Sequence, residues 1–333
     1  MAVYVKDTNL ATSVEWDRIW HECGYATYFH SREWAETWRD YTHGKMCPEP
    51  KLIAFNDGVR ALLPLSCERI FKGLAKRYVS SPAGTFGGWI STDNLSRAHV
   101  CRLTDILMSY SNIVWRINPY NNLTSEINIA GMKADGTRVI DLELGFDGVV
   151  KNWSKGHYAA VTQARKAGVV VRLAETLQDW HLYYDAYIDS IRRWGSSASS
   201  RYTLDLFDLL FNRHSPYVKL WLAMYEDKVI SGALCFYSRK HVVYWHGATI
   251  EKYFSFRPTN LLMYEAILDA CNRGYRWFDF NPSGGHEGAE AFKKSFGCEV
   301  KACGVYVRES CMVKAARKVS TLARHILKSV DKK

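Results

Sequence analysis

The residues best suited to chemistry lie between Tyr275 and Glu299, where an acid, a glycine-rich loop and two lysines follow one another. Asp279 stands in the aromatic run Trp277–Phe280, and burial in such a run raises a carboxyl pKa toward the range useful for proton transfer. The alternative is a structural acid that caps the next loop or pairs with a lysine. Asp279 is therefore a candidate catalytic residue with a structural alternative.

His246 is the second candidate for proton transfer. It lies in a predicted strand, next to Trp245 and before Gly247. A histidine at this strand position would shuttle protons at neutral pH. The alternative is a half-buried histidine whose hydrogen bonds are satisfied and which takes no part in chemistry.

Several basic and polar residues are candidates for binding phosphate or substrate. Lys293 and Lys294 follow the loop that opens at Asn281, and only one of them can face a cleft, because neighbouring positions diverge on a helix. A lysine suits phosphate as a mobile point charge, whereas a solvated lysine pair is the alternative. Further candidates are Arg201, Arg257, Thr259 and Asn260. The last two open a predicted helix, whose N-terminus favours anions.

These residues must be positioned by a mixed α/β sheet. The patterning predicts a strand over His241–Ala248, a helix over Pro258–Arg273 and a helix over Val149–Lys166. It then predicts a strand, a glycine loop and a short helix over Trp277–Phe296. Sites in α/β sheets commonly lie at the ends of such strands.

The first half of the chain shows two local signals. Thr12 and Glu15 have the spacing of a capping box, which predicts a helix through about Cys23. The loop Ser80–Gly88 is rich in glycine but lacks the Gly-Lys-Ser/Thr ending of a phosphate-binding P-loop. It either lines a substrate cleft or is an ordinary loop.

The two halves of the chain repeat one pattern. Trp115-Arg116-Ile117-Asn118-Pro119 parallels Trp277-Phe278-Asp279-Phe280-Asn281-Pro282, and the turn at Asp57 parallels the turn at Asp227. The shared order of hairpin, helix and strand indicates a duplicated module. We expect an α/β fold of two modules, each a mixed sheet flanked by helices, over residues 1–140 and 141–310. Residues 311–333 form a separate basic segment.

Composition limits the class of protein. The 333 residues are 47% hydrophobic, which suits one or two folded domains. The net charge of +10 favours anionic partners such as nucleic acid, phosphorylated substrates or an anionic membrane surface. Nine cysteines without a Cys-x-x-Cys pair, and no recognisable signal peptide, predict a cytoplasmic protein with reduced thiols and no metal site.

The stretch around Asp279 resembles the C-terminal signature of FemAB-type peptidyltransferases and their GNAT-like acyltransferase relatives. The resemblance rests on Phe278-Asp279-Phe280-Asn281 and on Phe292-Lys293-x-x-Phe296-Gly297. It extends to Trp245-His246-Gly247-Ala248-Thr249, Pro258-x-x-Leu261-Leu262 and Arg165-Lys166-Ala167-Gly168-Val169. It implies two GNAT-like (N-acetyltransferase-like) modules in tandem and transfer of an acyl or aminoacyl group to an amine. It also implies contact of Lys293 with a phosphate of a nucleotide-linked substrate or of tRNA, and makes Arg165, Trp245 and Asn281 candidates for substrate binding.

The resemblance leaves the donor open. Acyl-CoA-dependent GNAT enzymes usually carry Gln/Arg-x-x-Gly-x-Gly/Ala where this chain has Arg257-Pro258-Thr259-Asn260-Leu261-Leu262. Leucines replace the glycines, and Pro258 removes an amide donor. We expect aminoacyl-tRNA as donor, no permanently bound cofactor, and a cell-envelope precursor, sugar or peptide as acceptor. An acyl-CoA-dependent transferase for an amino sugar or amino acid is the alternative, and a non-catalytic RNA- or membrane-binding module is a third.

Residues 311–333 form a basic, amphipathic pattern. The apolar positions recur at helical spacing and the basic ones lie mostly elsewhere; the apolar positions are Val319, Leu322, Ala323, Ile326 and Val330. Such a helix either lies on an anionic membrane, binds RNA phosphates, or packs its apolar stripe on the protein.

Overall fold

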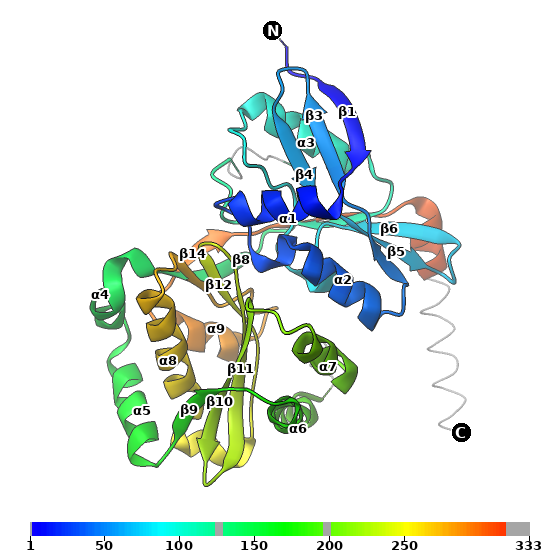
Figure 1. Ribbon diagram of the computed structural model, residues 1–333. Coiled ribbons are helices and arrows are strands. Elements are labelled where there is room, and N and C mark those ends of the chain that lie inside the picture. Colours follow the sequence, from blue (N-terminus) through cyan, green and yellow to red (C-terminus); the bar gives the residue numbers. More distant parts are fainter. Residues whose placement is uncertain (1, 124–128, 196–200, 318–333) are drawn as a thin grey trace, which may run out of the picture. The chain divides into compact units, whose positions relative to one another are not determined.

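The computed structural model divides the chain into two compact units of mixed α/β architecture (Figure 1). It describes residues 2–123, 129–195 and 201–317. Among these, the first unit takes the residues within Met1–Cys23, Phe29–Ala134 and Cys303–Lys333, and the second takes Gly24–Tyr28 and those within Asp135–Ala302. The predicted α/β fold of two modules is thereby confirmed.

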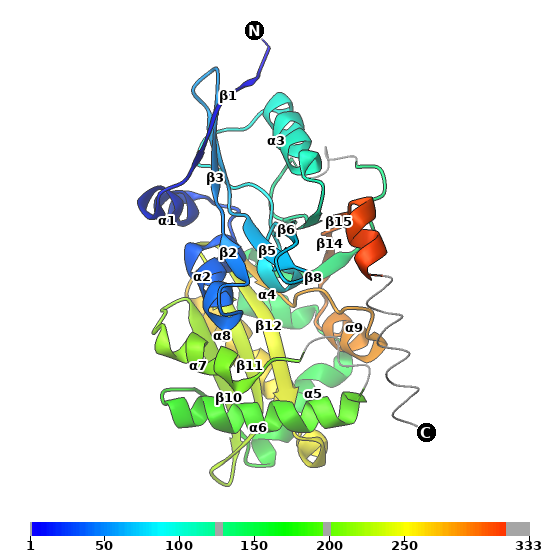
Figure 2. The ribbon, with the colours of Figure 1, turned by 90° about the vertical axis from the view of Figure 1, so that its right-hand side faces the viewer.

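Among its described residues, the first unit contains eight strands, three helices and the helical residues 311–317. The helices are α1 (Ser13–Glu22), α2 (Arg32–Tyr41) and α3 (Arg97–Ser109). The strands are β1 (Val5–Leu10), β2 (Met46–Pro48), β3 (Lys51–Phe55), β4 (Arg60–Leu63), β5 (Ser66–Ile70), β6 (Ala75–Val79), β7 (Ile113–Arg116) and β15 (Val305–Arg308). Helix α3 packs against β7 and runs beside the strands of this unit (Figure 2).

Two sheets build the first unit, one of order β1-β3-β4 and one of order β15-β7-β6-β5-β2. Strands β4 and β5 follow each other directly but belong to different sheets, and Pro64 stands between them. Proline has no N–H for the ladder, so it ends the pairing of β4 with β3. The core of this unit is apolar and includes Leu103, Trp89 and Trp115, all buried.

The second unit contains six helices and seven strands among its described residues. The helices are α4 (Gly145–Lys151), α5 (Lys155–Lys166), α6 (Leu177–Trp194), α7 (Leu204–Asn212), α8 (Pro258–Asn272) and α9 (Glu287–Lys294). The strands are β8 (Gly136–Asp141), β9 (Val170–Leu173), β10 (Val218–Tyr225), β11 (Lys228–Tyr237), β12 (His241–Thr249), β13 (Trp277–Asp279) and β14 (Glu299–Ala302).

One seven-stranded sheet of order β14-β8-β13-β12-β11-β10-β9 organises the second unit. Helices α5 and α8 cover one face of this sheet, and α6 and α7 cover the other (Figure 1). The middle strands are buried on both faces, as the run Ile230–Tyr237 shows, because helices shield them from water on each side. The sheet therefore forms a rigid base from which β12 and β13 position a site.

The predicted repeat is confirmed by the strand pairing. Strand β7 runs parallel to β6 in the first unit, and β13 runs parallel to β12 in the second. In each pair a helix connects the two strands, α3 in one unit and α8 in the other. The matching runs that begin at Trp115 and Trp277 thus occupy equivalent strands.

The borders of the units differ from the predicted division at residues 140 and 310. Strand β8 lies before the predicted border, yet it pairs with β13 and β14 in the second sheet. Strand β15 comes from the C-terminal end of the second stretch, yet it pairs with β7 in the first unit. Both placements depend on pairing between strands that lie far apart in the sequence. Local sequence patterns do not show which distant strands pair.

Local signals fix most helix ends. The capping box at Thr12 and Glu15 is confirmed, with the Glu15 amide donating to the Thr12 hydroxyl over 3.2 Å. The predicted helix Val149–Lys166 is wrong as a single element, because α4 ends at Lys151 and α5 begins at Lys155. Ser154 takes extended backbone angles at the start of α5, which breaks the helix between them.

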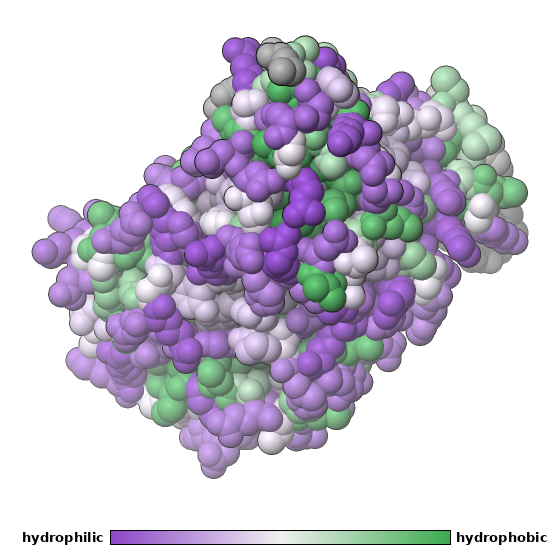
Figure 3. Space-filling view, turned by 45° about the horizontal axis from the view of Figure 1, so that its top comes forward, coloured by the Kyte–Doolittle hydropathy of each residue, from purple (hydrophilic) through white to green (hydrophobic). Residues whose placement is uncertain are grey.

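The basic C-terminal segment is described only in part. Residues 311–317 are helical. The apolar positions from Val319 to Val330, on which the amphipathic prediction rests, lie outside the described residues. Within the described ranges, no helix is both long and apolar enough to cross a bilayer. On the face shown in Figure 3, hydrophilic residues predominate and hydrophobic ones form separate patches.

Candidate active site

A fork between β12 and β13 opens the sheet of the second unit. The two strands pair over only three positions, from His241 opposite Trp277 to Val243 opposite Asp279. Beyond this point β12 continues to Thr249, whereas Asn281 takes a left-handed conformation (φ 59°) and leads the chain out of the sheet. The final residues of β12 therefore have no strand beside them on this edge among the described residues.

Asp279 and Lys293 hold the turn that makes the fork. The fully buried carboxylate of Asp279 accepts hydrogen bonds from the Thr137 hydroxyl and, over 2.7 Å, from the Asn281 amide. Lys293 donates from Nζ to the Asn281 carbonyl over 2.6 Å. Burial lowers the Lys293 pKa to about 8, although the Asp279 charge opposes this shift. These bonds fit the structural alternative foreseen for Asp279.

The expected contact of Lys293 with a substrate phosphate needs correction. Only 7% of Lys293 is exposed, and its ammonium is hydrogen-bonded to the chain's own backbone. The sequence motif correctly predicted the helix that carries Lys293. The side chain of Lys293, however, packs against the turn at Asn281 and is buried there. Lys294, the neighbouring position, is exposed.

Glu290 adds a second clamp on the loop after β13. It accepts hydrogen bonds from Ser283 at 2.8 Å and from Arg138 at 2.5 Å, so the loop is tied to both α9 and β8. The hydrogen bond from Ser283 is the main cause that lowers the Glu290 pKa. The fork is thus held open by side chains from three elements.

A β-bulge in β12 separates its side chains onto two faces. Leu234 of β11 pairs with His246, but the next residue, Cys235, pairs with Tyr244, so Trp245 is an extra residue. A bulge re-aims neighbouring side chains. Tyr244 accordingly packs with the core on the α8 side, whereas Trp245 stacks on Tyr202 with ring centres 5.2 Å apart.

His246 lies on the α6 side of the bulge, among aromatic rings. Its Nδ1 shares a hydrogen bond of 2.6 Å with the Tyr183 hydroxyl, and the Tyr187 ring centre lies 4.5 Å away. Burial lowers the His246 pKa to about 3, so the ring is neutral near pH 7. This corrects the expectation that His246 shuttles protons by titrating at neutral pH.

The open edge of β12 lines a pocket of about 320 Å³ within the second unit. That volume falls in the usual range for small-ligand sites. Helix α6, the η6 turn (Glu251–Phe256), the start of α8 and α9 complete the wall. The lining residues are Ser190, Arg193, Trp194, Tyr244, Gly247, Ala248, Thr249, Phe254, Arg257, Pro258, Thr259, Asn260, Ala289 and Phe292. Three predicted substrate-binding residues, Arg257, Thr259 and Asn260, thus come together.

The pocket has a basic and aromatic rim. Its lining includes two arginines and no acidic residue. The Arg193 guanidinium lies 4.7 Å from the Phe254 ring centre and donates to the Ser190 hydroxyl over 3.3 Å. Trp194 and Phe254 are 41% and 42% exposed, which is unusual for such large rings. The rim is therefore suited to an anionic ligand that carries a flat ring.

Arg257 opens α8 in a left-handed conformation with φ of 55°. Its side chain is exposed, and the described residues provide it with no ion-pair partner. Pro258 supplies no N–H, and the Asn260 amide already donates to the Arg257 carbonyl over 3.1 Å. The helix start thus offers a side-chain cation to an anion but few free backbone amides.

Gly247 and Tyr244 shape the floor of the pocket. The Tyr244 hydroxyl packs against the α-carbon of Gly247, so any side chain at residue 247 would overlap it. On the unpaired edge of β12, the Thr249 backbone already bonds Ser190 and Arg193 of α6. The backbone of Gly247, further back on this edge, is where a ligand lying along the strand would bind. A carbonyl held there by an N–H would be polarised toward attack by an amine.

The other predicted site residues lie outside this lining. Arg165 forms an ion pair of 2.9 Å with Glu265 and covers the Tyr264 ring, and it therefore fastens α5 to α8. Arg201 donates to the Gly195 carbonyl over 2.6 Å. Trp245 and His246 point away from the Tyr244 side of β12, toward Tyr202 and Tyr183 respectively. Asn281 contributes backbone bonds to the fork.

Sequence reasoning missed several lining residues, among them Ser190, Arg193 and Trp194 of α6. The motif around Gly247 pointed to β12, but nothing in the sequence joined it to α6. Only the packing of α6 against β11 and β12 reveals that link.

The second unit has a parallel strand pair, β12 and β13, joined by α8, and α6 and α7 precede the hairpin of β10 and β11. The family model for the acetyltransferase (GNAT) domain matches residues 155–294, which hold the whole pocket. The chain has the FemAB-type, GNAT-like fold, and the match of this region to an acetyltransferase domain supports an acyltransferase.

Solved structures give the same fold. The crystal structure of FemX is 13% identical, covers 90% of this chain and 97% of its own, and has a TM-score of 0.68. A conserved protein of unknown function from Bacteroides thetaiotaomicron is 10% identical, covers 92% and 100%, and scores 0.58. The C-terminal domain of a putative lysylphosphatidylglycerol synthetase from Agrobacterium fabrum is 12% identical, covers 87% and 96%, and scores 0.52. No curated protein matches the sequence.

Proposed function

We propose that the chain forms amide bonds by transferring an aminoacyl group from aminoacyl-tRNA to an amine of a cell-envelope precursor, sugar or peptide. The observation that carries the proposal is the form of the pocket beside β12. It joins an open strand edge to a rim with two arginines and no acid. The end of a charged tRNA offers a phosphate, a flat adenine ring and an ester, which match these features.

The chemistry is a direct displacement. The acceptor amine attacks the ester carbonyl, a C–N bond forms, and the C–O bond to the ribose breaks. The ribose oxygen leaves with a proton, and the amine loses one. The edge of β12 would polarise the carbonyl, and Arg257 would bind the phosphate of the donor, since Arg193 is already paired with Asp189 over 3.4 Å. Among the described lining residues there is no histidine or carboxylate to act as base.

Asp279 remains a predicted catalytic residue, and its contacts favour an indirect role. Its carboxylate is fully buried and already binds Thr137 and Asn281. We therefore assign it to positioning the fork. Trp245, stacked on Tyr202, offers a flat surface to an acceptor sugar or peptide on the other side of the bulge.

The missing amides at the start of α8 support tRNA over acyl-CoA as donor. A pyrophosphate cradle requires several free N–H groups, and Arg257-Pro258 replaces them with one side-chain cation. The second candidate, an acyl-CoA donor, is favoured by the match of the pocket region to an acetyltransferase domain. We place the protein in the cytoplasm, with phosphorylated or nucleotide-linked acceptors and with residues 311–333 as a peripheral membrane contact.

Donor titration tests the proposal. The full-length protein is mixed separately with charged tRNA and with acetyl-CoA at one fixed salt concentration, and binding and loss of the donor ester or thioester are followed. Arg257→Gln serves as the site variant and Arg165→Gln as the control. Tight binding of charged tRNA with ester loss that needs Arg257 supports the proposal. A response to acetyl-CoA alone overturns the tRNA donor in favour of acyl-CoA.

A further inference from the structure

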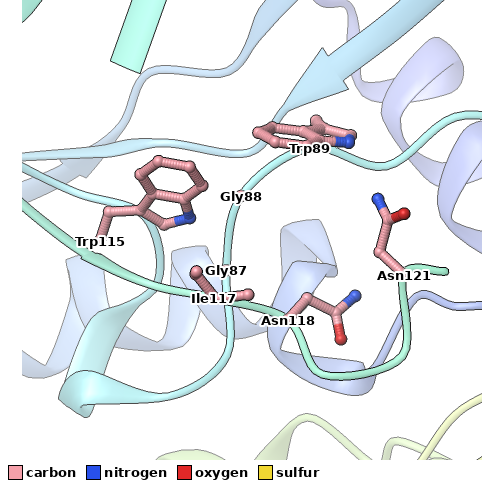
Figure 4. A pocket seen from close by; sticks show the side chains of 7 residues that line it. All are labelled: Gly87, Gly88, Trp89, Trp115, Ile117, Asn118 and Asn121. Carbon is pink, nitrogen blue, oxygen red and sulfur yellow. The ribbon is translucent and has the colours of Figure 1, made fainter. Parts of the chain in front are cut away.

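The first unit has a small pocket of its own at the fork of its parallel strands. Strands β6 and β7 pair through Tyr78 with Ile113 and Val79 with Val114, and Gly87 forms an isolated parallel bridge with Ile117, the residue after β7. The pocket lies beyond this pairing, where ligands of α/β sheets commonly bind. Its lining consists of Gly87, Gly88, Trp89, Trp115, Ile117, Asn118 and Asn121 (Figure 4).

Two tryptophans of this lining carry unused hydrogen-bond donors. The Nε1 atoms of Trp89 and Trp115 are buried and have no acceptor among the described residues. A buried donor without a partner costs about 1–3 kcal/mol, so such groups are uncommon unless something binds them. In Figure 4 the Trp115 nitrogen lies on the side of its ring toward Gly88, and the Trp89 nitrogen lies on the side toward Asn121.

Asn121 contributes a third donor. Its Oδ1 accepts the Leu123 amide over 3.0 Å, which fixes the side-chain amide so that its NH₂ group remains for other contacts. The lining contains no acid, and the Asn118 side-chain oxygen already accepts the Tyr120 amide over 3.2 Å. The pocket therefore presents N–H groups and calls for an oxygen acceptor.

Gly88 keeps the space in front of Trp115 open. Its φ is +111°, and an added Cβ would come 3.0 Å from the Trp115 Nε1 atom. The loop before it is anchored by bonds from the Gly87 amide to the Arg116 carbonyl at 3.0 Å and from the Arg116 Nε to the Gly84 carbonyl at 2.6 Å. The pocket is thus preorganised rather than formed on binding.

The size and neutrality of the pocket define the ligand group. The free volume is about 10 Å³, close to the space of one water-sized sphere, so only the tip of a ligand enters. No charged residue lines it, and an anion buried without a cation would be unfavourable. We propose that this pocket is a second binding site, separate from the pocket beside β12, which receives the carbonyl oxygen of an amide or acyl group.

The test follows the indole N–H signals of the full-length protein by nitrogen–proton NMR. Trp89→Phe and Trp115→Phe each remove one signal and so assign the pair. Acetamide and N-acetylglucosamine serve as carbonyl-bearing probes, and isopropanol serves as the control without a carbonyl. The expected result is a saturable downfield shift of both assigned signals with the two amide probes and none with isopropanol.

Asn121→Asp exchanges the donor for an acceptor at nearly equal size, and Asn122→Asp makes the same change at an exposed neighbour. We expect the first to weaken amide binding at least tenfold and the second to leave it unchanged. No saturable shift of the assigned signals, or equal binding by both aspartate variants, would mean that the pocket holds only a water molecule. Either result overturns the proposal and leaves the transfer pocket unaffected.

Discussion

Lys293 and Asn281 are joined by a hydrogen bond of 2.6 Å from a buried ammonium to a backbone carbonyl. The carbonyl belongs to a residue with a left-handed backbone, at the point where the chain leaves β13. The bond therefore fixes the direction in which β13 departs from β12, and with it the width of the fork. Lys293, which belongs to the motif that resembles the FemAB-type signature, thus stabilises the shape of the site.

This bond predicts that Lys293→Met reduces stability. The variant loses a hydrogen bond from a charged donor and leaves the Asn281 carbonyl without it, so we expect a loss of about 2 kcal/mol in the free energy of unfolding. Lys294→Met, at the exposed neighbouring position, should stay within about 0.5 kcal/mol. Urea denaturation measures both, and equal effects would argue against the buried role of Lys293.

The Arg257 side chain should determine donor affinity. Removing its charge with Arg257→Gln takes away a charge-assisted contact, so we expect the donor KM to rise about tenfold, or about 1.4 kcal/mol, with kcat little changed. Arg165→Gln removes an arginine outside the pocket and should leave KM within about twofold of the parent. Steady-state kinetics at low and high salt separate the two cases, and a KM unchanged in Arg257→Gln would remove this residue from the site.

The contact between Gly247 and Tyr244 predicts a coupled pair. Gly247→Ala places a Cβ against the tyrosine ring, so we expect a loss of about 1–3 kcal/mol in stability and weaker donor binding. Adding Tyr244→Leu removes the obstructing ring and should restore much of the stability. A double-mutant cycle measures the coupling. Additive losses would show that the two residues do not meet as described.

His157 predicts a pH dependence of stability. It is 4% exposed and packs with its ring centre 3.9 Å from that of Phe296, and burial lowers its pKa to about 4. Between about pH 6.5 and pH 4 the unfolded state binds more protons at this residue than the folded state, so stability falls as the pH falls. The slope for one histidine approaches about 1.4 kcal/mol per pH unit.

Urea denaturation across this pH range checks the slope. His157→Gln should reduce the slope by up to about 1.4 kcal/mol per pH unit, and the part that remains comes from His246, whose pKa burial also lowers. His43→Asn, at an exposed position, should leave the slope as in the parent. A parent slope that His157→Gln does not change would place the pH dependence in other groups.

Local patterns of the sequence predicted several elements of the fold. The capping box at Thr12, the strand over His241–Ala248 and the helix opening at Pro258 depend on neighbours a few residues apart, and the structure has each of them. The same holds for the repeat of the strands at Trp115 and Trp277 and for the family signature around Asp279. These features need only backbone propensity and hydrophobic spacing.

The site itself was decided by tertiary structure. Arg193 lines the pocket because α6 packs on β11 and β12. Lys293 was predicted to bind substrate but does not line the pocket, because its ammonium is hydrogen-bonded to the Asn281 carbonyl. The bulge at Trp245 turned His246 toward aromatic rings, where burial lowered its pKa. Strand β8 pairs with β13, and β15 pairs with β7, in each case across a long stretch of sequence. Burial, strand pairing and the charges around a side chain all depend on residues that are distant in the sequence. A single sequence therefore shows which chemical groups are present but not which of them come into contact.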